Sequence, residues 1–271
     1  MSQLFGANMY SIQHLITAGM EPAHYQTMLH YVMDQIPDVD FFDCRVSTAD
    51  KNAIQALENA GFRFVGKEVY MARSLVQSPV PKEYGQTDCI PCPYELQTEV
   101  LELAKKTHFH NRYMYDPEVR HQDAVNVYRK YLADLGFKKE FRTMIMRNGQ
   151  KLLGFIFYKY NNVLSQIVGN KYASLDFIAV NPEAQNSGVG EALNKAALFD
   201  LVRSSATHVV VRTFGSNYPA IRICQKVGFK ITSSDLHFHL WVRPRAQAKH
   251  RLQFIVFTGN RPSLASTKFI I

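Results

Sequence analysis

The sequence predicts an α+β fold, and three observations support that prediction. Predicted helices and strands follow one another along most of the 271 residues. A strand, Leu175 to Val180, leads through a glycine-bearing loop into an amphipathic helix, Glu191 to about Arg203. A strand–helix–Gly-Phe–strand unit occurs twice: Arg45, Ala53-Ile54 and Gly61-Phe62 find counterparts 167 positions later at Arg212, Ala220-Ile221 and Gly228-Phe229.

The first half supplies the elements of one such unit. Apolar spacing predicts an amphipathic helix over Pro22 to Gln35, ended by Pro37, and a short buried strand over Phe41 to Ser47. Thr48 or Asp50 caps the next predicted helix, Lys51 to Asn59, which Gly61 closes. Residues 64–65 and 68–73 then predict a hairpin or two short strands.

The stretch from Val76 to Cys92 is the best candidate for a linker, because prolines and a glycine interrupt it. Two helices are predicted next, over residues 95–106 and 119–135. An Asn148-Gly149 turn joins two strands of a predicted hairpin, 141–147 and 152–159. The remaining predicted elements are strands at 173–180, 208–213 and 236–242, a helix at 217–226, and a strand-like run at 252–257.

Composition limits the classes of partner. Hydrophobic residues make up 46% and charged residues 20%, which excludes a disordered chain. The formal charge of +8 suits nucleic acid, a membrane surface or a phosphorylated small molecule. No basic stripe with interleaved aromatic residues is visible, so nucleic acid is disfavoured. No stretch is long enough to cross a membrane, and no signal peptide is visible at the start.

The four cysteines, Cys44, Cys89, Cys92 and Cys224, are few enough to suit a reducing compartment, and we expect a cytoplasmic protein. Cys89-Ile-Pro-Cys92 is a lone C-x-x-C motif. A zinc or redox site would need further ligands or a thioredoxin-like context, and neither is visible. We therefore expect no metal.

The loop Gln185-Asn186-Ser187-Gly188-Val189-Gly190 is the strongest candidate site. Its position between a strand and a helix places free backbone N–H groups at a helix N-terminus, which attracts anions. Gly188 and Gly190 allow a phosphate to approach the backbone. The spacing is too short for a dinucleotide fingerprint and lacks the lysine of a P-loop. A glycine-bearing turn without a ligand is the alternative.

The second half also carries Asn217-x-x-Ala220-x-x-x-Cys224-x-x-x-Gly228-Phe229. Together with the loop and the strand order, this set resembles the GCN5-related N-acetyltransferase (GNAT) family over about Tyr94 to Val242. The resemblance implies a mixed sheet that splays open between the strand ending at Val180 and the strand ending at Thr213. It implies acyl-CoA as co-substrate, with pantetheine bonded near Ile178 and Val180, pyrophosphate on the amides of Gln185 to Gly190, and Asn217 touching the cofactor.

The resemblance also bears on catalysis. It implies that the amine attacks the thioester directly, and many family members protonate the leaving thiolate with a tyrosine at the position of Cys224. The cysteine here could donate that proton or simply belong to the core. Asp176 is the preferred general base, because it lies on the strand beside the split and, by a period of two, on the side of Val180. The histidines at 237 and 239 share one face of a late strand and are weaker candidates.

The acceptor signal is Asn111-Arg112-Tyr113-x-x-Asp116-Pro117, followed by Tyr128-Arg129-Lys130-Tyr131-Leu132. It is similar to the dTDP-fucosamine N-acetyltransferases and related nucleotide-amino-sugar acyltransferases, with Asn111 and Tyr113 replacing their serine and phenylalanine. The resemblance implies a dTDP-linked amino-dideoxyhexose as acceptor, in O-antigen or lipopolysaccharide biosynthesis, and an acetyl or larger acyl group such as 3-hydroxybutanoyl. Arg112 would grip a diphosphate, Tyr113 would stack, and Asp116, His108 and His110 would complete the acceptor site. A capped helix start with a satisfied ion pair is the alternative.

Domain organisation follows from the repeat and the resemblance. We expect a partial GNAT-like domain at residues 1–78, a linker at 79–93, an acyltransferase domain at 94–243 and an extension at 244–271 that could pair a strand edge in a homodimer. The first copy lacks the glycine loop near Ala18 to Ala23, so one active site per chain is expected. Two other functions stay open: an acetyltransferase for a peptide, lysine or amino acid amine, and a non-catalytic coenzyme A-binding module.

Overall fold

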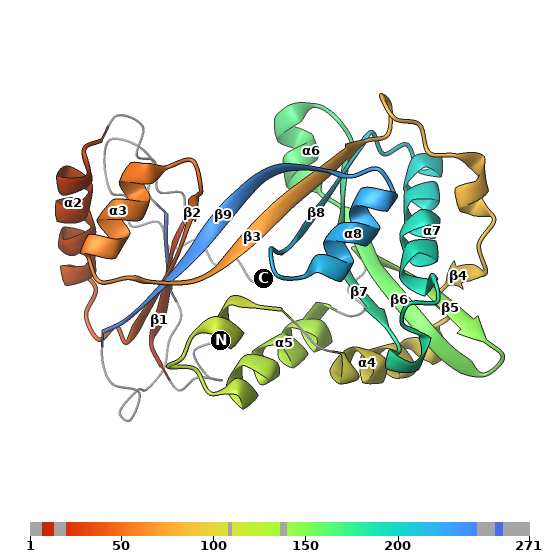
Figure 1. The fold of residues 1–271 in the computed structure, drawn as a ribbon, viewed down its shortest axis with the longest axis horizontal. Helices are drawn as coiled ribbons and strands as arrows, with labels where there is room; N and C mark the ends of the chain where they lie inside the picture. Colours follow the sequence, from red (N-terminus) through yellow and green to blue (C-terminus); the bar gives the residue numbers. More distant parts are fainter. Residues whose placement is uncertain (1–6, 14–19, 108–109, 136–139, 243–252, 257–271) are drawn as a thin grey trace. The chain divides into compact units, whose positions relative to one another are not determined.

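A computed structural model describes residues 7–13, 20–107, 110–135, 140–242 and 253–256. The strands are β1 (Met9–Gln13), β2 (Phe41–Ser47), β3 (Arg63–Ser74), β4 (Cys89–Pro91), β5 (Phe141–Asn148), β6 (Lys151–Tyr160), β7 (Tyr172–Val180), β8 (His208–Phe214), β9 (Lys230–Trp241) and β10 (Gln253–Val256). The helices are α2 (Pro22–Asp34), α3 (Lys51–Asn59), α4 (Gln97–Lys106), α5 (His121–Leu135), α6 (Asn162–Val168), α7 (Val189–Arg203) and α8 (Tyr218–Lys226), shown in Figure 1. The described residues also form the 3₁₀ turns η1 (Lys82–Gly85), η2 (Tyr94–Leu96), η3 (Arg112–Tyr115) and η4 (Pro182–Ala184).

The chain forms two compact units, and the predicted domain boundaries stay a prediction. The first unit comprises Met1–Glu68, Asn111–Val127 and Ser233–Ile271; the second comprises Val69–His110 and Tyr128–Thr232. Strands β3 and β9 run through both. In the first unit the strand order is β10-β1-β2-β9-β3, and in the second it is β9-β3-β8-β7-β6-β5-β4. The part of β9 from Ser233 onward belongs to the first unit, where it pairs antiparallel with β2.

The second unit is a mixed sheet with helices on both faces, which confirms the predicted α+β class. Strands β5, β6 and β7 pair antiparallel, whereas β7 and β8 pair parallel. One face packs its apolar side chains against α7 and α8, with Leu193, Leu198 and Leu201 at the centre of that core. The other face carries Phe155, Phe157 and Phe177 and packs against α4 and the second half of α5.

Strands β7 and β8 separate part of the way along, as the resemblance implies. Their parallel register runs only from Tyr172↔His208 to Leu175↔Val211, yet β7 continues to Val180 and β8 to Phe214. Beyond Leu175, the edge of β7 that faces β8 forms no ladder with it. The sheet of the second unit is therefore split between these two strands.

A β-bulge lies in β7 where the split begins. In the pairing of β6 with β7, Phe157 is opposite Phe177 and Tyr158 is opposite Leu175, so Asp176 is the extra residue. The bulge breaks the alternation of side chains: Ala173 and Leu175 pack with Ile178 and Val180 in the core under α7, whereas Phe177 and Ala179 pack on the opposite face. The predicted sharing of one face by Asp176 and Val180 is therefore wrong, because a two-residue period does not hold across a bulge.

The internal repeat is present in the structure at the predicted offset. Strand β8, helix α8 and strand β9 start and end 167 residues after β2, α3 and β3, respectively (208 − 41 = 167). The helix caps repeat as well, since Asp50 accepts a hydrogen bond from Ala53 N and Asn217 accepts one from Ala220 N. Gly61 and Gly228 both adopt a left-handed conformation, with φ of 84° and 87°, which ends each helix.

Most predicted elements are confirmed within a few residues, and five places differ. Strand β9 begins at Lys230, six residues before the predicted start at Leu236. Residues 63–74 form the single strand β3 rather than two short strands. The predicted linker contains η1 and the strand β4, which pairs with β5 despite its proline because it lies at the edge of the sheet. Strand β1 and helix α6 were not predicted.

Candidate functional site

The glycine loop and the start of α7 form the candidate anion site in the second unit. The first hydrogen bond of the helix joins Ala192 N to Gly188 O, at 3.0 Å. The N–H groups of Val189, Gly190 and Glu191 therefore have no acceptor within the helix. Gln185 N–H already donates to Pro182 O at 3.3 Å, so it takes part in the turn before the loop. Gln185, Asn186, Ser187 and Gly188 are exposed.

The two loop glycines serve different purposes. Gly188 is the N-cap of α7 with φ of 89°, and a Cβ added there would meet nothing within 4 Å. Its backbone conformation and the open space above it suit a ligand. Gly190 is buried, and a Cβ there would lie 3.0 Å from Ile223 Cδ1 and 3.6 Å from Val180 Cγ2. Gly190 therefore allows α7 to pack closely on α8, and its predicted contact is through its backbone alone.

The charge beside this helix terminus favours an anion. Glu191 in the first turn of α7 lies 2.8 Å from Lys195 Nζ and 3.5 Å from Lys226 Nζ. The hydrogen bond and charge of Lys195, followed by those of Lys226, hold the pKa of Glu191 below its usual range. The three side chains sum to a charge of +1, which adds to the positive end of the helix dipole.

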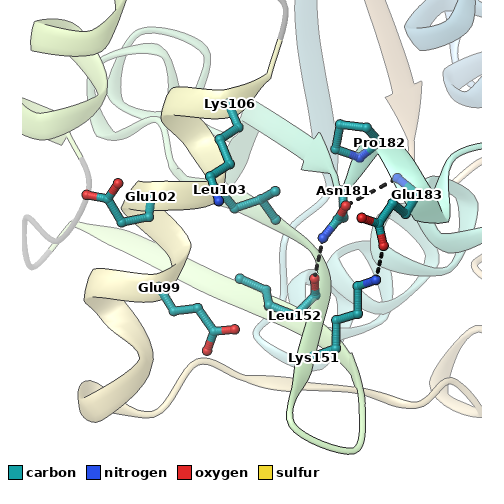
Figure 2. A pocket seen from close by; sticks show the side chains of 9 residues that line it. All are labelled: Glu99, Glu102, Leu103, Lys106, Lys151, Leu152, Asn181, Pro182 and Glu183. Atoms are coloured by element: carbon teal, nitrogen blue, oxygen red, sulfur yellow. Dashed lines mark hydrogen bonds and ion pairs between the residues drawn. The ribbon is translucent and has the colours of Figure 1, made fainter.

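Asn181 fixes the turn that leads into the loop. Its Nδ2 donates to Leu152 O at 3.3 Å, its Oδ1 accepts from Glu183 N at 3.2 Å, and its backbone N–H donates to Leu153 O at 2.8 Å. Figure 2 shows the side-chain bonds together with the ion pair between Lys151 and Glu183. The turn is thereby fastened to the start of β6.

A cavity of about 320 Å³ lies beside this turn, and Figure 2 shows its lining. Its walls come from α4, the start of β6 and η4. The charged lining residues are three carboxylates and two ammonium groups, Glu99, Glu102, Glu183, Lys106 and Lys151. Acidic groups outnumber basic ones, so this cavity does not select for a pyrophosphate, and the α7 terminus is the better anion site.

The turn between β8 and α8 brings together two of the predicted residues. Asn217 caps α8: its Oδ1 accepts from Ala220 N at 3.4 Å, and its Nδ2 donates to Thr213 Oγ1 at 3.1 Å. Ser216 Oγ lies 3.4 Å from Nδ1 of His110, which is exposed. Among the described residues of the second unit, His110 is the predicted acceptor residue. His108 lies outside the described residues.

Asp176 occupies the bulge at the point where β7 and β8 separate. Ser174 Oγ donates to its Oδ2 at 2.7 Å. Burial raises the pKa of Asp176, and the bond from Ser174 and the charges of Lys159 and Arg212 oppose that rise. The role of Asp176 as general base stays a prediction, and its raised pKa and its place at the split in the sheet are compatible with that role.

Cys224 belongs to the core. Its side chain packs with Leu193, Val227 and Phe229 under the sheet, and the residue is 5% exposed. Burial raises the pKa of its thiol to about 11, so the thiol is protonated at neutral pH. A role as proton donor stays a prediction, as do the cofactor contacts of Ile178 and Val180, whose side chains pack in the same core.

Three predicted acceptor residues belong to the first unit and have protein partners there. Arg112 Nη2 lies 2.7 Å from Asp43 Oδ2 and donates to Tyr113 Oη at 3.1 Å. Asp116 Oδ2 accepts from Trp241 Nε1 at 3.0 Å and lies 2.6 Å from His239 Nδ1. Asn111 caps η3 by accepting from Tyr113 N and Met114 N. These contacts match the capped helix start with a satisfied ion pair, and the acceptor roles of Arg112, Tyr113 and Asp116 stay predictions.

Sequence reasoning missed two residues that the structure brings to the site, Ser174 and Asn181. Ser174 donates a hydrogen bond to the side chain of Asp176, and Asn181 accepts one from the backbone N–H of Glu183. In each case the partner lies two residues further along the chain. The Asn-Pro pair at 181–182 is a turn signal that could have identified Asn181. No comparable signal marks Ser174, since a serine in a strand usually faces solvent.

Comparisons with known proteins agree with this geometry. Residues 98–229 match the model of the acetyltransferase (GNAT) family. A mycothiol acetyltransferase of Saccharomonospora viridis is 31% identical over 70 residues, 26% of this chain and 23% of that protein. The spore coat polysaccharide biosynthesis protein SpsD of Bacillus subtilis is 22% identical over 230 residues, 81% of this chain and 72% of that protein.

A solved structure also shares the fold. A GCN5-related N-acetyltransferase from Sphaerobacter thermophilus has a TM-score of 0.55 and 14% identity, covering 85% of this chain and 71% of that chain. None of the described helices has the length and hydropathy to cross a membrane. The described residues contain no cluster of three His, Cys, Asp or Glu side chains placed to hold a metal.

Proposed function

Because residues 98–229 of this chain match the GNAT family of acetyltransferases, whose members use acetyl-CoA as co-substrate, we propose that the protein transfers an acyl group from acyl-CoA to an amine. The observation that carries the proposal is the separation of β7 from β8 directly before a glycine loop at the N-terminus of α7. An unpaired strand edge and a helix terminus follow one another along the same segment. That order suits a ligand with an extended amide arm and a diphosphate.

Each part of the site has a proposed task. The amides of residues 186–191 and the net positive charge around Glu191 would hold the pyrophosphate. The free edge of β7 near Ile178 and Val180 would bond the pantetheine amides and orient the thioester. A strand N–H aimed at the thioester carbonyl would stabilise the oxyanion that develops on attack. Asp176 would accept the proton of the acceptor amine, directly or through a water.

For the acceptor we propose an amine on a nucleotide-linked amino sugar, with a dTDP-linked amino-dideoxyhexose as the first choice. The similarity to SpsD extends over both units, and that protein's name refers to polysaccharide biosynthesis. Tyr128 and Tyr131 lie on the α5 side of the sheet, and the ring of Tyr128 is 5.9 Å from that of Phe177, next to Asp176. Aromatic rings beside a carboxylate suit a sugar that carries an amine.

The test is acceptor-dependent release of thiol from acetyl-CoA, measured with dTDP-amino sugars, free amino acids, a lysine peptide and a peptide N-terminus. We expect release with a dTDP-amino sugar and much less with the other amines. If thiol is released only with an amino acid or a peptide, the acceptor is an amine of that class and not an amino sugar. Coenzyme A binding without release for any amine would favour the non-catalytic module.

Asp176→Asn provides the matched test of the base. It should lower kcat by about 100-fold or more, because general-base catalysis contributes that much, while the affinity for coenzyme A stays unchanged. Asp34→Asn is the control, since Asp34 is an exposed carboxylate at the end of α2. Wild-type kcat in Asp176→Asn would remove Asp176 from the proposal.

A further inference from the structure

Ser174 and Asp176 are joined by a hydrogen bond of 2.7 Å along one strand, from Ser174 Oγ to Asp176 Oδ2. The bond shows that the two side chains lie on the same side of β7, although Asp176 is the extra residue of the bulge. The described residues form no other hydrogen bond to this carboxylate. One carboxylate oxygen, Oδ2, is therefore held by the protein, whereas Oδ1 accepts no hydrogen bond from the described residues.

The bond spans the point where the strand changes character. Ser174 is still paired on both sides, with Lys159 of β6 and Val210 of β8. Asp176 is the extra residue of the bulge and follows the last pair between β7 and β8. Ser174 therefore lies where β7 is paired on both sides, whereas Asp176 lies where the pairing with β8 has ended.

The charged groups near Asp176 are less able than Ser174 to hold its carboxylate in one position. Lys159 Nζ lies 3.5 Å from Glu140 Oε1 and 4.3 Å from the ring centre of Phe141, so its charge is shared. Arg212 acts on Asp176 through its charge. Of the groups that oppose the effect of burial on the pKa of Asp176, Ser174 acts most strongly.

We propose that Ser174 is a positioning residue of the acyl transfer, which fixes Asp176 Oδ2 and thereby keeps Oδ1 ready to take the proton of the acceptor amine. The inference rests on the proposed function. An acceptor ammonium gives one proton to Oδ1, and the amine lone pair then attacks the thioester carbon. The carbon–sulfur bond breaks, and the thiolate takes the remaining extra proton of the attacking nitrogen, which leaves an amide and a thiol. Asp176 returns its proton to water.

The first measurement needs no substrate. Protein labelled with ¹³C at the aspartate carboxyl carbons is titrated by NMR, and Asp176→Asn assigns the signal. Ser174→Ala should raise the pKa of Asp176 by about one pH unit, because a hydrogen bond to a charged group is lost. Ser174→Thr retains the hydroxyl and should restore the wild-type value. Ser165→Ala is the control, since Ser165 Oγ also makes hydrogen bonds, to Asn161 O and Tyr172 N. An unchanged pKa in Ser174→Ala, or an equal shift in Ser165→Ala, would overturn the proposal.

The second measurement is the pH profile of kcat/KM for the acceptor. In Ser174→Ala the acidic limb should move up by the same amount, about one pH unit, while KM for acetyl-CoA is unchanged. A limb that stays in place while the NMR titration moves would overturn the proposal. If the wild-type protein releases no thiol with any amine but the NMR shift is present, the proposed function fails, whereas the control of Asp176 by Ser174 stands.

Discussion

Asp116 Oδ2 lies 2.6 Å from Nδ1 of His239 in the buried interior of the first unit. Trp241 Nε1 donates to the same oxygen at 3.0 Å, and Glu118 N donates to Oδ1 at 2.9 Å. Three donors on one carboxylate are what a buried charge needs in order to be tolerated. In this structure the side chain of Asp116 connects the segment that follows η3 to β9 within the unit.

Replacing Asp116 by Asn should destabilise the first unit. Whichever way the amide is turned, one N–H group faces a donor, either Glu118 N or the pair His239 and Trp241. We expect the free energy of unfolding to fall by about 2 to 4 kcal/mol, measured by urea denaturation. Glu118→Gln is the control, because its ion pair with Arg63 is exposed and contributes about 1 kcal/mol or less. Equal losses in the two variants would contradict this account of Asp116.

The stability of the first unit should fall as the pH is lowered. Burial lowers the pKa of His239. Burial alone would raise the pKa of Asp116, but the hydrogen bonds from His239 and Trp241 lower it. A group whose pKa is lower in the folded state than in the unfolded state binds more protons when the protein unfolds. Its contribution to the free energy of unfolding is therefore complete above the unfolded-state pKa and is lost as the pH falls below that value. The window for His239 therefore lies below about pH 6.5, and the window for Asp116 lies below about pH 3.9.

The measurement is the free energy of unfolding at several pH values between 5 and 8. Each titrating group contributes a slope of up to about 1.4 kcal/mol per pH unit. His239→Asn retains an N–H group near Asp116 and cannot titrate in this range, so it should flatten the slope between pH 5 and 6.5. A slope equal to that of the wild type would show that His239 does not carry the effect.

The sequence predicted the parts of the fold that depend on local pattern. The strand, glycine loop and helix around Gly188 lie next to one another in the chain, and the repeat offset of 167 residues holds for whole elements. The bulge at Asp176 leaves no mark in an alternating pattern, so the face of that side chain was predicted wrongly. The pairing of Asp116 with His239 joins residues 123 positions apart and depends on β9 reaching β2, which no local signal indicates.

Gly188 tests the anion site through a pair of nearly isosteric variants. Asn and Asp both tolerate the left-handed conformation that Gly188 adopts at φ of 89°, and the space above it is open. They differ by one negative charge at the proposed pyrophosphate position. We expect the Kd for coenzyme A to be at least about tenfold higher in Gly188→Asp than in Gly188→Asn, which corresponds to about 1.4 kcal/mol. Equal affinities by isothermal titration calorimetry would move the pyrophosphate away from this loop.

Asn181 tests whether the loop must be fastened to bind its ligand. Asn181→Ala removes the bonds to Leu152 O and Glu183 N, which hold the turn against the start of β6. A loosened turn must be ordered again on binding, so the Kd for coenzyme A should rise by about three- to tenfold, or about 1 kcal/mol. Hydrogen exchange at the amides of residues 183–190 should become faster in the free protein.

Asn161→Ala is the matched control for this variant. Asn161 caps α6 in the same unit by accepting from Leu164 N at 2.9 Å, so its loss also removes a side-chain cap, but at a helix away from the glycine loop. In Asn161→Ala the free energy of unfolding should fall by about as much as in Asn181→Ala. Its affinity for coenzyme A should equal that of the wild type. If the two variants weakened binding equally, the effect would come from general destabilisation. Unchanged exchange at residues 183–190 in Asn181→Ala would show that the loop is ordered without this side chain.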